Sequence, residues 1–194
     1  MKCALAFVIL SAVATGLGSA AVHIQEIPAV SGTIGLGTWN TQAEYKDIEV
    51  TVGDKFLYRS DFRNEAKDWE PSGGDWQVVA GAYRQGATGE NRRSILKVPE
   101  LAEATDYTVR LMARKIAGAE GFLILFHVTD GDFYWLNLGG WLNRSHGVEH
   151  KRVLVGRAVP GRIETGRWYE IRLELTGRRI QCFLDGARIL DVSD

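Results

Sequence analysis

Residues 107–114 of the chain are Tyr-Thr-Val-Arg-Leu-Met-Ala-Arg, a stretch in which polar residues separate the members of an apolar series. Side chains two residues apart share one face of a β-strand, so Tyr107, Val109 and Leu111 are expected to lie on one face. Residues 169–175, Tyr-Glu-Ile-Arg-Leu-Glu-Leu, alternate in the same way. Both stretches therefore predict strands with one buried and one polar face.

Residues 121–128, Gly-Phe-Leu-Ile-Leu-Phe-His-Val, are apolar on both faces, which is typical of a central strand covered on both sides. The pair Asp185-Gly186 between two alternating stretches favours a hairpin with a type I′ turn. Only residues 99–104 are expected to form a short helical turn. The pattern predicts an all-β fold, an antiparallel two-sheet β-sandwich or jelly roll.

The composition is that of an ordinary single-domain chain of 194 residues with a net charge of −1. This charge balance gives no electrostatic basis for binding nucleic acid or an anionic membrane surface. We therefore expect neither as a partner.

The first residues have the layout of a secretory signal peptide. Lys2 is followed by the mostly apolar residues 3–17 and by small residues up to Ala21. We expect a signal peptide at 1–21, a leader at 22–32 and a sandwich domain at 33–194. The mature protein is expected to be secreted or periplasmic, with Cys182 as a buried structural thiol.

Four segments carry a resemblance to a known family: residues 34–48, 113–126, 134–141 and 166–172. The Ala-Arg-Lys run at 113–115 and the Asn-Leu-Gly-Gly-Trp string at 137–141 are its most specific parts. Residues 33–192 resemble the concanavalin A/laminin-G-like sandwich module attached to family 51 α-L-arabinofuranosidases. The resemblance implies a non-catalytic, sugar-facing module.

Two departures from that family's pattern lead to further expectations. The catalytic (β/α)₈ barrel needs alternating strands and helices, and this sequence shows no such alternation. The activity is therefore not expected to accompany the resemblance. The strand at 34–38 opens the sandwich, whereas in most concanavalin A-like domains it closes it. We expect a circularly permuted sandwich in which residues 33–52 lie beside the hairpin at 180–192.

A sugar site needs aromatic faces that stack on C–H surfaces and forked polar groups that pair with hydroxyls. The sequence clusters such residues between the strand at 107–115 and the loop after residue 141. We expect the ligand, an arabinan- or arabinoxylan-like polysaccharide or oligosaccharide, to contact Arg114, Lys115, Glu120, Trp135, Asn137, Trp141 and His146. Trp135 could instead pack in the core, and Arg114 with Glu120 could form a structural ion pair. Core packing is the preferred interpretation for Trp76 and Trp168.

The enzyme alternative is a glycoside hydrolase, which needs two carboxylates flanking the scissile bond. The sequence lacks the Glu-x-Asp-x-x-Glu string of sandwich glucanases, which leaves Glu120 and Glu149 as the candidate pair. An enzyme acting on 3-keto sugars shares the fold, and no motif here supports it. A separate glycosidase is a candidate partner.

We expect no cofactor and no catalytic metal. His146 and His150 are four residues apart, but that spacing makes a ligand pair on a helix, and the local pattern is loop or strand. A structural calcium ion stays open, because Asp61, Asp130 and Asp132 lie in predicted turns, although their spacing is not that of a calcium loop.

Overall fold

The computed structural model describes residues 30–194. The predicted signal peptide at 1–21 and residues 22–29 of the predicted leader lie outside the described residues. Within the described part of the chain, no helix is long and apolar enough to cross a membrane.

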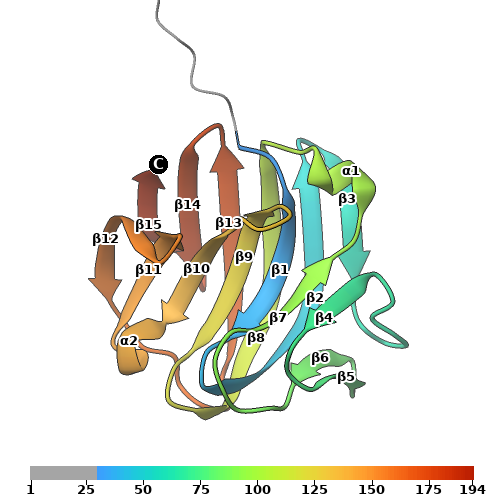
Figure 1. Ribbon diagram of the computed structural model, residues 1–194, viewed down its shortest axis with the longest axis vertical. Coiled ribbons are helices and arrows are strands. Elements are labelled where there is room, and N and C mark those ends of the chain that lie inside the picture. The colour runs from blue at the N-terminus through green and yellow to red at the C-terminus, as the bar shows by residue number, and fades with distance from the viewer. Residues whose placement is uncertain (1–29) are drawn as a thin grey trace, which may run out of the picture.

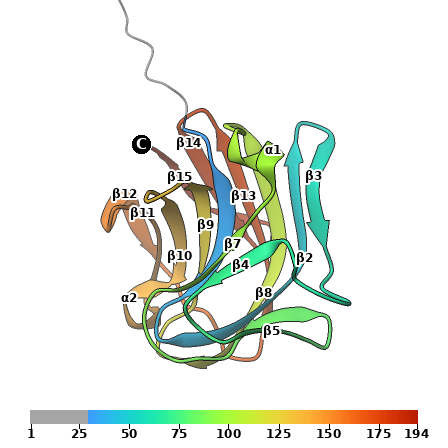
Figure 2. The same cartoon turned by 45° about the vertical axis from the view of Figure 1, so that its right-hand side comes forward.

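The described residues form two antiparallel sheets packed face to face, as Figure 1 and the rotated view in Figure 2 show. The seven-stranded sheet has the order β12-β11-β10-β9-β1-β7-β4, and its strands are β1 (Thr33–Thr38), β4 (Trp69–Ser72), β7 (Arg92–Leu96), β9 (Phe122–Val128), β10 (Tyr134–Gly139), β11 (Ser145–His150) and β12 (Val153–Pro160). The eight-stranded sheet has the order β15-β14-β13-β8-β2-β6-β5, with β3 also paired to β2, and its strands are β2 (Thr41–Val52), β3 (Lys55–Ser60), β5 (Trp76–Val79), β6 (Ala82–Gln85), β8 (Tyr107–Gly118), β13 (Trp168–Thr176), β14 (Arg179–Leu184) and β15 (Ala187–Ser193). The predicted antiparallel two-sheet sandwich is confirmed.

Across residues 30–194, helix is limited to two short segments, α1 (Pro99–Ala102) and α2 (Gly140–Asn143). The expected helical turn at 99–104 is therefore confirmed. The segment α2 is an irregular turn, because Trp141 and Leu142 have positive φ angles of 52° and 62°. These left-handed residues turn the chain between β10 and β11 and direct Trp141 onto the outer face of the sheet.

The core between the sheets is built from the alternating faces predicted for β8 and β13. Val109 pairs with Leu173 and Leu111 pairs with Ile171, and all four side chains are buried. Strand β9 is covered on both sides, as expected, since it contributes Phe122, Ile124 and Phe126 to the core between the sheets. Its other face supplies Leu123 and Leu125 to a second apolar cluster with Trp135. This second cluster underlies the site described below.

The expected position of residues 33–52 beside the last hairpin is wrong. Strand β1 lies between β9 and β7 in one sheet, and β2 lies between β8 and β6 in the other. Strands β8 and β13 separate β2 from the β14–β15 hairpin. The physical reason is that the alternating strand β8 is hydrogen-bonded on both of its edges, to β2 and to β13. Residues 33–52 therefore supply one central strand to each sheet.

Two local predictions are confirmed. Asp185 and Gly186 both have positive φ angles, 49° and 79°, and they form the turn between β14 and β15. Cys182 is buried as a free thiol in β14, and burial raises the pKa of its thiol far above the ordinary value. A thiol held protonated in the core is inert toward nucleophilic chemistry, which agrees with a structural role.

Candidate functional site

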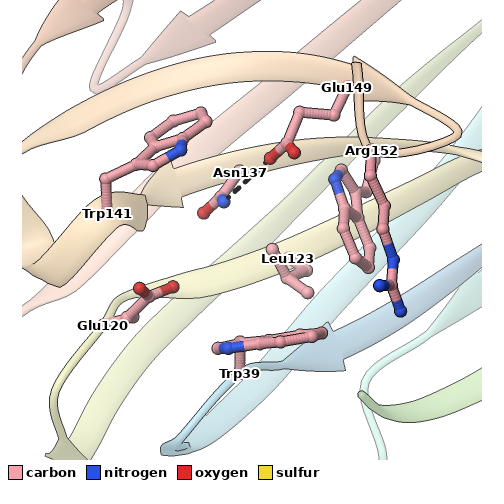
Figure 3. A pocket seen from close by; sticks show the side chains of 8 residues that line it. Trp39, Glu120, Leu123, Asn137, Trp141, Glu149 and Arg152 are labelled. Carbon is pink, nitrogen blue, oxygen red and sulfur yellow. Dashed lines mark hydrogen bonds between the residues drawn. The ribbon is translucent and has the colours of Figure 1, made fainter. Parts of the chain in front are cut away.

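A hollow of about 240 Å³ lies on the outer face of the seven-stranded sheet, opposite the face that packs on the other sheet. Figure 3 shows the side chains that line it: Trp39, Glu120, Leu123, Trp135, Asn137, Trp141, Glu149 and Arg152. Aromatic rings and carboxylates from separate parts of the chain meet here.

The floor of the hollow follows from the register of three neighbouring strands. Asn137 of β10 pairs with Leu123 of β9, and Trp135 of β10 pairs with Glu149 of β11. Because alternate residues of a strand share a face, Trp135 and Asn137 point outward together while Leu136 and Leu138 enter the core. The strands thus place apolar and polar groups side by side on one surface.

The walls of the hollow come from turns. Trp39 belongs to the turn between β1 and β2, and its ring meets that of Trp135 edge-on, with ring centres 6.0 Å apart. Trp141 belongs to α2, and its ring packs over Gly147 of β11. A Cβ atom added at Gly147 would come 3.0 Å from the Trp141 ring, so the glycine leaves room for the indole. Trp39 and Trp141 stand on two sides of the hollow (Figure 3).

The polar groups of the hollow are partly held by the protein. The Asn137 side-chain amide donates a hydrogen bond to Glu149 Oε1 at 3.2 Å. The backbone N–H of Leu142 donates to Glu120 Oε1 at 3.1 Å. A carboxylate has lone pairs for about four hydrogen bonds, so both glutamates keep acceptor sites that face the hollow. These contacts fix the orientation of both groups.

The structure brings together most of the residues expected at a sugar site. Glu120, Trp135, Asn137 and Trp141 line the hollow, and so does Glu149, which the sequence offered only as half of an enzymatic carboxylate pair. Trp135 is 8% exposed, so it both lines the hollow and packs in the second apolar cluster. Its indole N–H is buried without a hydrogen-bond partner among the described residues.

Arg114 does not share this surface, which corrects the expected arrangement. It lies on β8 in the eight-stranded sheet and donates to Glu44 Oε2, with Nε at 3.0 Å. Its guanidinium also lies 4.6 Å from the centre of the Trp168 ring. The alternative ion pair with Glu120 is not formed, and Trp168 is a partly exposed platform for cations rather than a core residue.

Lys115 and His146 are also separate from the hollow, because both side chains are buried, each only 4% exposed. Lys115 continues the inward face of β8, where burial lowers the pKa of its ammonium group and the charge of Glu120 partly opposes this. His146 Nδ1 accepts a hydrogen bond from the N–H of Gly139 at 2.9 Å, and burial lowers the pKa of the imidazole. Neither residue lines the hollow.

Besides Glu149, which was named only for the enzyme alternative, three lining residues were absent from the expected contacts: Trp39, Leu123 and Arg152. Leu123 lies in the stretch at 121–128 that is apolar on both faces. That second apolar face could have predicted that side chains cover the outer surface of this strand. Trp39 and Arg152 lie in turns, where alternation gives no information about direction.

The three aspartates considered for calcium do not form a cluster. Among residues 30–194, no group of three or more His, Cys, Asp or Glu side chains is placed to hold a metal ion. Asp132 lies 3.0 Å from His150 Nε2 and 3.1 Å from Lys151 Nζ. Burial by itself would raise its pKa, but the hydrogen bonds and charges of these two partners hold it below the ordinary value. These three aspartates are therefore not arranged to hold calcium together, and a structural calcium ion stays an open expectation from the sequence.

A comparison with known proteins gives one informative similarity. The chain is 40% identical over 166 residues to the extracellular exo-α-L-arabinofuranosidase of Streptomyces chartreusis. The match covers 81% of the chain but only 20% of the enzyme, so the chain spans about a fifth of that relative's length. No family model and no solved structure matches the chain. The similarity is therefore to one segment of a much longer glycosidase, as the resemblance in the sequence implies for an accessory module.

Proposed function

We propose that the chain is a non-catalytic carbohydrate-binding module that holds an arabinan- or arabinoxylan-like polysaccharide in the hollow on the seven-stranded sheet. The observation that carries the proposal is the convergence of three indoles and two carboxylates on one hollow of about 240 Å³. Mostly apolar hollows with a few oriented polar groups are typical of small-ligand sites.

The arrangement suits the two kinds of surface that a sugar ring presents. The exposed ring of Trp141 and the partly buried ring of Trp39 present apolar surfaces on which the C–H groups of a sugar ring can pack. Glu120 and Glu149 supply hydrogen-bond acceptors for the sugar hydroxyl groups, and Asn137 supplies a donor and an acceptor. The indoles would supply affinity, and the polar groups would fix the orientation of the ring.

The extent of the similarity supports a binding role within a larger enzyme system. The matched segment is a fifth of an extracellular arabinofuranosidase, so most of that enzyme's length lies outside it. We infer that this chain acts at the same kind of polysaccharide, outside the cytoplasm, together with a separate glycosidase. Export through the signal peptide at 1–21 is part of this proposal.

A glycoside hydrolase is the second candidate, because Glu120 and Glu149 line the same hollow. Retaining and inverting glycosidases both place two carboxyl groups on either side of the scissile bond. In this protein each of the two carboxylates already accepts a hydrogen bond from the chain, which suits hydroxyl binding. We therefore place hydrolysis second.

Affinity electrophoresis tests the proposal directly. The purified chain should be retarded in gels that contain arabinan or arabinoxylan and should migrate normally in gels without polysaccharide. Incubation with the same polymers should release no reducing sugar. Unretarded migration in every gel would overturn the binding proposal. Sugar release that disappears in both Glu120→Gln and Glu149→Gln would favour the hydrolase.

A further inference from the structure

A second hollow of about 310 Å³ adjoins the first on the same face of the sheet. The two hollows share Trp135, Glu149 and Arg152. The second extends from these shared residues toward Arg93 on β7 and Phe133. A polysaccharide that fills the first hollow therefore has room for a neighbouring sugar in the second.

The second hollow differs from the first in its charge. Its lining includes three cationic side chains, those of Arg93, Lys151 and Arg152. Lys151 pairs with Asp132 at 3.1 Å, but Arg93 and Arg152 form no ion pair within 4.0 Å with any residue of the described chain. Two guanidinium groups are thus left without anionic partners beside a surface that can hold a sugar.

Arg93 is the more specific of these two groups. Its guanidinium carbon lies 4.8 Å from the centre of the Phe133 ring, a stacked position that holds the group at the hollow. Its Nε atom is buried and has no hydrogen-bond partner among the described residues. Burial of this group also lowers its pKa from the ordinary arginine value. A buried donor without a partner costs free energy, and an anion bound to the other nitrogens of the same guanidinium group would offset part of that cost.

We propose that the second hollow is a subsite for a uronic acid residue of the same polysaccharide, with the carboxylate bound by Arg93 and Arg152 and the ring resting against Phe133 and Trp135. This inference rests on the proposed carbohydrate-binding function and adds the charge of the ligand to it. The planar guanidinium fork matches a carboxylate with two parallel hydrogen bonds.

The neighbouring acidic groups favour a singly charged ligand. Glu149 and Asp132 also line the hollow, so a phosphate dianion would meet more repulsion there than a carboxylate. The geometry therefore points to an acidic sugar within a mostly neutral polymer.

The test compares glucuronoarabinoxylan with the same polymer after chemical reduction of its carboxyl groups to alcohols. The two ligands have the same linkages and branching, and they differ only where each uronic acid has become the corresponding neutral hexose. The wild-type chain should bind the acidic polymer about tenfold more tightly in affinity electrophoresis, as expected for one charge-assisted pair. This comparison needs no variant, so it stands whether or not a substituted chain folds.

Variants then assign the effect to the second hollow. Arg93→Gln should bind both polymers with the affinity that the wild type shows for the reduced one. Arg59→Gln is the matched control, because Arg59 also stacks on a phenylalanine, Phe56 at 4.2 Å, but lies on β3 in the other sheet. Arg59→Gln should keep the wild-type preference for the acidic polymer.

Each other outcome overturns a defined part of the account. Equal binding of both polymers by the wild type would overturn the uronate subsite and leave the binding proposal standing. Binding of neither polymer would overturn the proposed function itself. Equally tight binding of dextran sulfate, lost in Arg93→Gln, would show general anion attraction and would also overturn the uronate subsite.

Discussion

Replacement of Trp141 by alanine should separate ligand binding from folding more cleanly than any other change in the hollow. Trp141 is 39% exposed, and its turn between β10 and β11 already has a positive φ angle of 52°. Alanine also has a Cβ atom, so the backbone strain of this left-handed position stays the same. The fold should therefore lose little when the indole is removed.

The expected loss of affinity follows from the exposed part of the indole. A tryptophan covers about 150–250 Å² when it is buried, so an exposure of 39% leaves about 60–100 Å² for a sugar to cover. At about 25 cal/mol per Å², this area corresponds to roughly 1.5–2.5 kcal/mol. That free energy is about a 10- to 60-fold increase in Kd.

Isothermal titration calorimetry with an arabinoxylan oligosaccharide measures this loss, and thermal unfolding checks the fold. Trp168→Ala is the matched control, because Trp168 is a partly exposed tryptophan on the eight-stranded sheet. Trp168→Ala should bind as the wild type does. The reasoning is refuted if Trp141→Ala unfolds at the wild-type temperature and binds within twofold of the wild-type affinity.

Three further changes test contacts that hold the fold. Trp135→Ala should lower the free energy of unfolding by about 3 kcal/mol in urea denaturation, because this side chain is only 8% exposed; a loss below about 1 kcal/mol would contradict its place in the second apolar cluster. Glu44→Gln should cost about 2 kcal/mol at neutral pH, because the carboxylate is 2% exposed between two arginines. Burial alone would raise the pKa of Glu44, but the two arginines hold it below 4.5, so the ionised carboxylate stabilises the fold above pH 4.5 and this stabilisation is lost as the pH falls through the lowered pKa. Acid should therefore destabilise Glu44→Gln less than it destabilises the wild type in unfolding scans at decreasing pH. An equal loss of stability in acid for both proteins would contradict this. Gly121→Ala should cost about 3 kcal/mol, since its Cβ atom would lie 1.9 Å from the Leu138 carbonyl oxygen, whereas Gly86→Ala, with its nearest contact at 3.4 Å, should be nearly neutral in the same measurement.

Period-two alternation was sufficient to predict strands such as β8 and β13 and to name two residues of the floor of the site. The faces of β8 and β13 follow from their sequences, and Trp135 with Asn137 were found because they share a face of one strand. The run at 121–128 indicated a strand covered on both sides, and its second face proved to support the hollow. These signals are local, so one strand at a time is enough to detect them.

Several failures share one physical origin, because alternation assigns a side chain to a face of a strand but does not assign the strand to a sheet. Arg114 was grouped with Glu120 and Trp135 because consecutive strands are usually neighbours. Here the chain crosses from β8 in the eight-stranded sheet to β9 in the seven-stranded sheet, so the outward face of β8 points away from the hollow. Residues 33–52 were misplaced for a related reason, because the sequence does not show that β2 and β13 occupy the two edges of β8.

Turns were the other source of error. Trp39 and Arg152 reach the hollow from turns, and turn side chains have no period from which their direction can be predicted. His146 shows the opposite case, since its cross-strand partner Leu138 lies in the core and carries His146 inward with it. The direction of His146 is set by the pairing of β10 with β11, which a single sequence does not reveal.

The central claim is that one face of the sandwich binds sugar through the hollow lined by Trp39, Trp135 and Trp141. The chain has six tryptophans, and their indole N–H signals can be followed separately by NMR while an arabinoxylan oligosaccharide is added. The account predicts that the signals of these three shift together with one Kd, while those of Trp69, Trp76 and Trp168 stay in place. Shifts confined to Trp69, Trp76 or Trp168, or no shifts at all, would contradict it.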